Sequence, residues 1–158
     1  MEHGYWLEQA IRMARDNASR GEGPFAALVV KDGQLVSTGV NRVQSEQDPT
    51  AHAELSAIRE ACKQLHTTDL SDCILYASGE PCPMCMGAIY WAKLGAVYYA
   101  CSKAEAREAA GFEDPLGSFY AEMAQAPHER TIPIHHLHVP GKLEPFQMHA
   151  SLSRQLED

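Results

Sequence analysis

The 158-residue sequence contains no long hydrophobic run and no low-complexity tract. The longest uncharged stretch in its middle, residues 81–92, contains proline and is too short to span a bilayer. Charged residues interrupt residues 2–16, where the apolar part of a signal peptide would lie. These absences disfavour a membrane-spanning protein and predict a cytoplasmic one. Because internal repeats and flexible linkers are also missing, we expect a single domain over residues 1–158.

Basic residues are scarce: 13 lysines and arginines stand against 21 aspartates and glutamates, for a formal net charge of −8. Nucleic-acid affinity comes largely from neutralising phosphates with Lys and Arg, so this balance disfavours a tRNA- or DNA-binding protein and also docking on anionic membranes. Cysteines are few and odd in number, five in all. In a reducing compartment we expect them to be thiols or metal ligands rather than disulfides.

Short apolar runs and amphipathic stretches alternate along the chain. The apolar runs predict five strands, over residues 25–30, 35–40, 73–78, 96–101 and 132–139. Apolar residues at helical spacing predict helices in the first 18 residues and over residues 51–65, 81–91, 104–110, 118–125 and 145–156. We expect loops over residues 44–50 and 111–117. This alternation implies an α/β fold, a three-layer α/β/α architecture whose five-stranded mixed sheet has helices on both faces.

Cys82 and Cys85 form a Cys-x-x-Cys pair at the start of one predicted helix, and His52 lies at the start of another. Two thiolates and an imidazole make a three-ligand zinc site. Structural zinc is usually closed by four protein ligands, whereas catalytic zinc keeps one position open for water. Glu54 follows His52 by two residues. Its carboxylate can reach the open position without binding the metal, and can there carry a proton from water to a substrate.

Each half of this pattern is weak alone, because Cys-x-x-Cys also occurs in redox pairs and in structural zinc sites. The combination of His-x-Glu with a later Pro-Cys-x-x-Cys is the established signature of zinc deaminases. A second group of potential ligands, His135, His136 and His138, lies on the predicted strand 132–139. It has no acidic partner at a suitable spacing, so we expect these histidines to face solvent.

Further motifs extend the pattern over nearly the whole chain. They are Pro49-Thr50-Ala51-His52-Ala53-Glu54, Glu80-Pro81-Cys82-Pro83-Met84-Cys85, Gly23-Pro24-Phe25, Asn41 and Gly87-Ala88-Ile89-Tyr90-Trp91-Ala92. With them the sequence resembles the cytidine deaminase-like superfamily of zinc hydrolases. Within that superfamily it is similar to bacterial guanine deaminases, through Gly111-Phe112-Glu113-Asp114, Glu129-Arg130-Thr131-Ile132-Pro133 and Pro145-Phe146-Gln147. It departs from them at Gly79, where a bulkier residue is usual, and in a tail without a pocket-closing aromatic residue.

The resemblance implies one zinc ion per chain, held by His52, Cys82 and Cys85, with Glu54 as the proton shuttle. It implies a specificity role for the carboxylate of Asp114. The other implied substrate contacts come from Asn41, the Ala53 backbone amide, Phe25 and Trp91. It also implies a homodimer in which segments of about residues 140–158 are exchanged, so that one tail covers the neighbour's pocket.

Several of these residues have a second interpretation. Asn41 could bond only its own loop, and Asp114 could cap the turn before Pro115. Phe25 and Trp91 could be ordinary core residues, because buried aromatics are common. Hydrogen bonding favours the substrate role for Asp114, since guanine offers ring N–H donors and an ionised aspartate only accepts.

The expected function is hydrolytic deamination of a free nucleobase, with guanine converted to xanthine and ammonia. One alternative is deamination of a smaller ring, such as isocytosine or a triazine, that repeats part of guanine's edge. A second is a tRNA adenosine deaminase, which the net charge of −8 disfavours. The third is a non-catalytic zinc scaffold, which would gain nothing from a proton shuttle such as Glu54.

Overall fold

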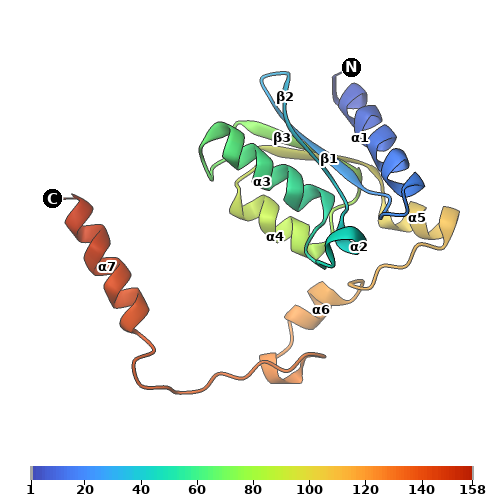
Figure 1. Cartoon of the computed structure of the whole chain (residues 1–158). Coiled ribbons are helices and arrows are strands. Elements are labelled where there is room, and N and C mark those ends of the chain that lie inside the picture. Colours follow the sequence, from blue (N-terminus) through green and yellow to red (C-terminus); the bar gives the residue numbers. More distant parts are fainter. Residues whose placement is uncertain (1, 158) are drawn as a thin grey trace. The chain divides into compact units, whose positions relative to one another are not determined.

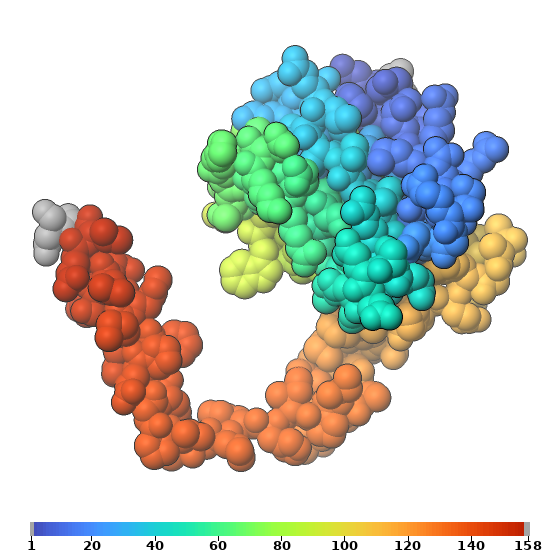
Figure 2. All heavy atoms as spheres, viewed as in Figure 1, coloured from blue at the N-terminus to red at the C-terminus, as the bar shows by residue number. Residues whose placement is uncertain are grey.

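A computed structural model describes residues 2–157 of the chain (Figure 1). Two compact units are present, the first ending at Gly117 and the second beginning at Ser118. Figure 2 shows the atoms of the first unit, coloured from blue to yellow, packed into one continuous body. The expected domain range also includes residues 1 and 158, which lie outside the described residues. No helix in the described part of the chain is both long and apolar enough to cross a membrane.

The first unit is built on a four-stranded mixed sheet with the strand order β2-β1-β3-β4. Strand β1 (Ala26–Lys31) is antiparallel to both of its neighbours, β2 (Gln34–Val40) and β3 (Cys73–Gly79). Strand β4 (Ala96–Cys101) runs parallel to β3 and forms an edge of the sheet. All four strands were expected from the sequence at nearly these bounds, and the mixed α/β architecture is confirmed.

Helices cover both faces of this sheet, as predicted. Helix α1 (Glu2–Ser19) contacts β1 and β3 on one face, where Leu28 and Tyr76 are buried. Helices α3 (Ala53–Leu65) and α4 (Pro83–Trp91) contact each other and cover the other face, where Val29 and Leu75 are buried (Figure 1). Neighbouring residues of one strand therefore point to opposite faces of the sheet and pack in two different hydrophobic clusters, as expected of a sheet that is covered on both sides. The remaining helices of this unit are α2 (Val43–Glu46) and α5 (Lys103–Ala110).

A glycine on β2 allows α3 to lie close to the sheet. A Cβ atom at Gly39 would lie 2.3 Å from the carbonyl oxygen of Ala53 and 2.6 Å from the amide nitrogen of Ala57. The hydroxyl of Ser37 donates to the carbonyl of Ala57 at 2.6 Å, which ties the same strand to the same helix. The position of the first turn of α3, and so of the residues that begin it, depends on this close contact.

Two predictions of local structure were wrong. The expected fifth strand over residues 132–139 is absent, since the sheet of the described residues has four strands. Ile132 and Leu137 in this segment are 78% and 73% exposed. The composition is strand-like, but a strand forms only where a neighbour supplies hydrogen-bond partners, and Pro133 removes one donor. The loop expected over residues 44–50 contains part of the short helix α2.

The second unit contains α6 (Phe119–Met123), a 3-10 helix (Pro127–Glu129) and α7 (Glu144–Glu157). The predicted helices near both ends of this region are confirmed. Inside the unit the guanidinium of Arg130 donates to the carbonyl of Met123 at 3.1 Å. The apolar side chains Phe146, Met148 and Leu152 of α7 are between 52% and 73% exposed. This unit thus has an amphipathic helix without a core of its own to cover the apolar face.

Candidate active site

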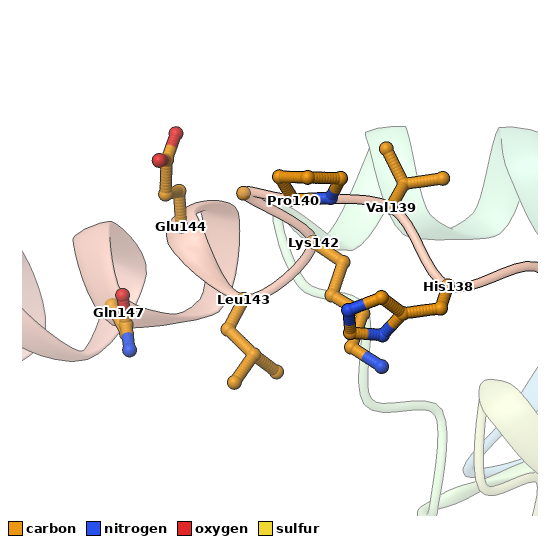
Figure 3. Close-up of a pocket in the computed structure, with 8 residues that line it drawn as sticks. His138, Val139, Pro140, Lys142, Leu143, Glu144 and Gln147 are labelled. Carbon is orange, nitrogen blue, oxygen red and sulfur yellow. The ribbon is translucent and has the colours of Figure 1, made fainter.

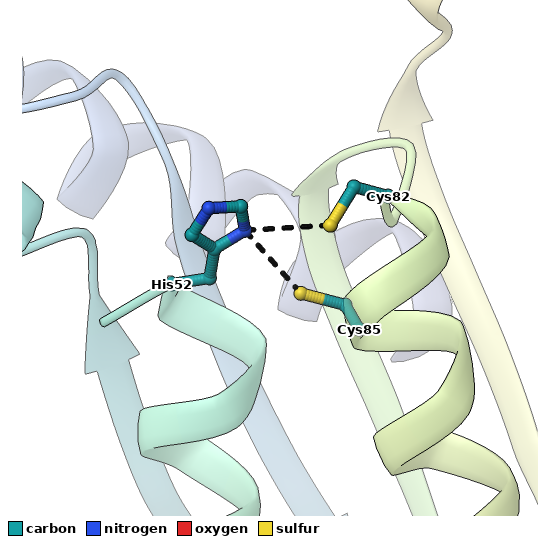
Figure 4. Close-up of side chains that lie close together, drawn as sticks. All are labelled: His52, Cys82 and Cys85. Carbon is teal, nitrogen blue, oxygen red and sulfur yellow. Dashed lines mark hydrogen bonds between the residues drawn. The ribbon is translucent and has the colours of Figure 1, made fainter. Parts of the chain in front are cut away.

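The candidate metal ligands come from the N-terminal ends of two neighbouring helices. His52 is the N-cap of α3 and Cys82 is the N-cap of α4, both in extended backbone conformation. Cys85 lies in the first turn of α4, where Pro83 has the fixed φ angle that favours a helix start. Because α3 and α4 lie side by side on one face of the sheet, the three side chains point toward one another (Figure 4).

The spacing of the three ligand atoms fits a zinc ion. The thiol sulfurs of Cys82 and Cys85 lie 3.4 Å and 3.5 Å from Nδ1 of His52, and all three atoms lie within 4.8 Å of one another. Tetrahedral coordination with ordinary zinc–sulfur and zinc–nitrogen bonds separates a sulfur from a nitrogen by about 3.6 Å. The donor set of two thiols and one imidazole is also the one that zinc prefers. These residues would therefore hold the ion with little rearrangement.

Electrostatics at the three ligands favour a cation. The Cys85 thiol and the His52 ring hydrogen-bond to the Cys82 sulfur and lower the pKa of Cys82 to about 4. The same hydrogen bond with Cys82, followed by burial, raises the pKa of the Cys85 thiol. Hydrogen bonding to Cys82 raises the pKa of His52 above its usual value. The site thus concentrates negative charge on sulfur, which a metal ion would neutralise.

Glu54 is the buried carboxyl beside this trio. It lies in the first turn of α3, and its side chain is 4% exposed. Burial raises the pKa of Glu54, and hydrogen bonding with Cys85 only partly opposes this shift. A carboxyl whose pKa is raised by desolvation accepts a proton more readily than an exposed one, which suits a general acid–base. The hydrogen bond with Cys85 brings the Glu54 carboxyl next to one of the candidate ligands.

Asn41 lies at the end of β2 and is 8% exposed. Its Oδ1 accepts the N–H of Val43 at 3.1 Å, and its backbone N–H donates to the carbonyl of Phe25. Asn17, itself 2% exposed, donates through its side-chain amide to the backbone carbonyls of Asn41 and Gly23, at 2.9 Å and 2.8 Å. The hydrogen bond from Val43 is local, as expected if Asn41 stabilises only its own loop. It uses the Oδ1 atom and leaves the NH2 group of Asn41 available as a donor.

Phe25 lies at the end of the sheet that carries the candidate site. A Cβ atom at Gly79 would come within 3.0 Å of the Phe25 ring, so the absent side chain at position 79 makes room for this aromatic. The ring meets Phe112 edge to face with centroids 5.4 Å apart. The ring of Phe25 therefore occupies space that a side chain at position 79 would need.

Asp114 lies in the loop that follows α5. Its Oδ1 accepts the N–H of Leu116 at 3.0 Å, and its Oδ2 lies 3.3 Å from Nζ of Lys103. The first bond is the turn-capping interaction that the sequence left open as a second role. A carboxylate offers about four acceptor positions, so these two partners leave room for a ligand.

The last two predicted substrate contacts, Ala53 and Trp91, differ in their burial. Ala53 is fully buried and is the first residue of α3, where backbone N–H groups have no acceptor within the helix. Trp91 is the last residue of α4 and is 88% exposed. It lies roughly 12 Å along the helix axis from the ligand end of α4. The structure does not bring Trp91 beside the candidate ligands of its own chain.

Among the described residues, the remaining histidines and cysteines form no second metal centre. His135, His136 and His138 are exposed, as expected. Within residues 2–157 no other group of three His, Cys, Asp or Glu side chains could hold a metal ion. A hollow in the second unit is lined by residues 138–144 and 147 (Figure 3). Its lining residues are not part of any such metal-binding group. All five cysteines are free thiols, in agreement with the prediction.

Sequence reasoning missed Asn17 and Lys103. Asn17 shares the buried face of α1 with Ala10 and Ala14, and this spacing of three and seven residues could have identified a buried polar group. Lys103 carried no such signal, since its partner Asp114 is distant along the chain and a lysine near a helix start is ordinary.

Comparison with known proteins agrees with this geometry. Residues 1–101 match the family model for the cytidine and deoxycytidylate deaminase zinc-binding region. Guanine deaminase of Bacillus subtilis (strain 168) is 46% identical over 158 residues, which are 99% of this chain and 99% of the relative. An X-ray structure of guanine deaminase from Bacillus subtilis matches with a TM-score of 0.88 and 47% identity, over 96% of this chain and 95% of that one.

A tRNA-specific adenosine deaminase of Aquifex aeolicus is more distant. It is 42% identical over 96 residues, which are 61% of this chain and 64% of the relative. The match to the zinc-binding family model includes His52, Glu54, Cys82 and Cys85, the residues that the structure gathers. The chain therefore belongs to the cytidine and deoxycytidylate deaminase family of zinc-binding proteins.

Proposed function

We propose that the protein is a zinc-dependent aminohydrolase that converts guanine to xanthine and ammonia. The observation that carries this proposal is a buried carboxyl, Glu54, beside a three-ligand metal site, in a chain whose full length matches a guanine deaminase. The alternative function is that of a tRNA adenosine deaminase. The tRNA-specific adenosine deaminase of Aquifex aeolicus matches 61% of this chain, whereas the guanine deaminase matches 99%. A tRNA substrate would also have to dock on a protein with a net charge of −8.

His52, Cys82 and Cys85 would hold the zinc ion. When bound, zinc would supply Lewis acidity and would lower the pKa of a water molecule, which makes the water a better nucleophile toward the carbon that carries the amine. Glu54 accepts the first proton of the attacking water and delivers it to the adjacent ring nitrogen. It then transfers the second proton of that water to the departing amine, which leaves as ammonia while the carbonyl forms. All atoms of guanine and water are accounted for in xanthine and ammonia.

The neighbouring residues would orient the base. The NH2 group of Asn41 and the backbone N–H of Ala53 can donate to ring acceptors, and the Asp114 carboxylate can accept from ring N–H donors. The Phe25 ring offers a flat apolar wall. A site built from such groups rejects bases that leave a buried partner unpaired.

We further propose that the protein is a homodimer with exchanged C-terminal segments. Two features support this. The outer edge of β4 has no partner strand among the described residues, and an unpaired edge is a template for pairing with another chain. Residues 132–139 have a strand-like composition but form no strand, and their apolar side chains are exposed. A second copy could supply the missing partner to both, and could cover Trp91. The free thiols are compatible with a reducing compartment, in line with a cytoplasmic enzyme.

The decisive experiment is an ammonia-release assay with the purified, zinc-loaded protein. The substrates are guanine, isocytosine, adenine, cytosine, guanosine, cytidine and an anticodon stem-loop that contains adenosine. Turnover of guanine with formation of xanthine is the expected result. Turnover of the stem-loop but not of guanine would instead identify a tRNA-editing enzyme, and absence of ammonia from every substrate would identify a zinc scaffold. Light scattering on the same sample should give twice the chain mass of 17.4 kDa, and a monomer would contradict the exchanged dimer.

A further inference from the structure

We propose that Lys103 is a positioning residue for base binding, which acts by holding the Asp114 carboxylate. This inference rests on the proposed function, because it requires Asp114 to contact the base. Lys103 lies outside all of the sequence motifs that carry the family resemblance.

The backbone of Lys103 is fixed to the segment that carries the cysteine ligands. Its N–H donates to Oε1 of Glu80 at 3.2 Å, and the N–H of Glu80 donates to the carbonyl of Cys101 at 2.8 Å. Glu80 precedes the ligand Cys82 by two residues. The side chain of Ser102, the N-cap of α5, accepts from the N–H of Glu105 in a complete capping box, which defines the start of that helix. Lys103 therefore begins at a defined position beside the candidate metal site.

From this position the side chain of Lys103 reaches the loop that holds Asp114. Its Nζ lies 3.3 Å from Oδ2 of Asp114, and the two side chains are 30% and 28% exposed. Such a pair is more shielded than the surface ion pair of Lys31 with Asp72, whose side chains are 36% and 56% exposed. Shielding from solvent makes an ion pair hold its geometry more strongly.

A second contact holds the same loop independently. Phe112, two residues before Asp114, packs edge to face on Phe25. With Oδ1 of Asp114 bonded to the N–H of Leu116 and Oδ2 facing Lys103, the carboxylate has one orientation, and its remaining lone pairs have fixed directions. A base that binds there meets an acceptor whose orientation has already been set, so less conformational freedom is lost on binding.

The test compares the zinc-loaded wild type with Lys103→Met, Lys103→Arg and the control Lys31→Met. Loss of a positioning contact that acts equally on bound substrate and transition state raises KM and leaves kcat nearly unchanged. We expect Lys103→Met to raise the KM for guanine about tenfold, the size of one charge-assisted interaction. Lys103→Arg should restore most of the affinity, because arginine also pairs with carboxylates. Lys31→Met removes a similar ion pair and should leave KM unchanged. If Lys103→Met loses zinc, Lys103→Gln replaces it in every comparison.

A second measurement does not depend on guanine turnover. Hydrogen exchange of the Leu116 amide reports the bond to Asp114, and it should become faster in Lys103→Met but not in Lys103→Arg or Lys31→Met. An unchanged KM in an active Lys103→Met enzyme overturns the proposal, and so does unchanged exchange at Leu116. If the wild type releases no ammonia from guanine, the proposed function is what fails, and the exchange rates alone decide whether Lys103 holds Asp114.

Discussion

The two units of this protein bury their apolar side chains to very different extents. In the first, Leu28, Leu75 and Tyr76 are at most 1% exposed and lie between a sheet and its covering helices. In the second, Leu137 and Phe146 are each 73% exposed. The first unit therefore has the packed interior needed to hold a metal site to within tenths of an ångström. The second has apolar surface that gains from burial against another molecule.

Because burial differs in this way, substitutions in the two units should have different effects. Substitutions of buried residues in the first unit should change chemistry and stability, because these side chains are fixed by their neighbours. Substitutions in the second should change association.

The substitution Glu54→Gln should cause the largest loss. The amide has nearly the same shape as the carboxyl but cannot carry a proton, so guanine turnover should fall by a factor on the order of 10²–10⁴. Zinc content, measured by elemental analysis, should stay at one ion per chain, because Glu54 is not one of the candidate ligands. A zinc-loaded Glu54→Gln protein with wild-type kcat would remove Glu54 from the mechanism.

The second largest effect is expected from a substitution at the close contact between β2 and α3. An alanine at Gly39 would place its Cβ 2.3 Å from the Ala53 carbonyl, so Gly39→Ala should destabilise the protein by about 3 kcal/mol, the upper range for overpacking. Zinc affinity should fall too, since α3 carries His52. The control is Gly87→Ala on α4, where nothing lies within 4 Å of the added atom. It should be neutral or slightly stabilising in chemical denaturation. Equal stability of the two variants would contradict this account.

Asn17→Leu should have an intermediate effect. It removes two hydrogen bonds to backbone carbonyls, a buried one to Asn41 and a partly buried one to Gly23, so unfolding free energy should fall by about 1–3 kcal/mol. The KM for guanine should rise as well, because the carbonyl of Asn41 loses its partner. Ser37→Ala removes one buried hydrogen bond, to Ala57 of α3. It should cost about 1 kcal/mol with less change in KM. If both variants change KM in proportion to their stability, Asn17 has no special link to Asn41.

The smallest change in stability is expected in the second unit. Phe146→Asp places a charge on the exposed apolar face of α7, and exposed substitutions usually change unfolding free energy by no more than about 0.5 kcal/mol. If the proposed dimer forms through this face, light scattering should nevertheless show a shift from dimer toward monomer, because the added charge opposes burial of the face. Gln147→Asp adds the same charge at a neighbouring exposed polar position and should preserve the dimer. A dimer that survives Phe146→Asp would locate the interface elsewhere.

Sequence reasoning succeeded where the signal is local. Strands β1 to β4 and the helices around them follow from apolar periodicity within each segment. His52 and Cys82 were identified because their helices begin at these residues and because their chemistry is distinctive. The fifth strand failed because residues 132–139 have strand-forming side chains but no strand beside them, a condition that lies outside the segment itself.

By itself the sequence predicted the type of chemistry, since a histidine, two cysteines and a glutamate at these spacings are typical of a three-ligand zinc site with a proton carrier. Only the tertiary structure decided which polar groups contact the other predicted site residues. Asn17 holds the carbonyl of Asn41, and Lys103 faces Asp114, through contacts between residues separated in the chain. The physical reason is that metal-ligand identity is a property of the residues, whereas burial, hydrogen-bond partners and ion pairs are properties of how distant segments pack.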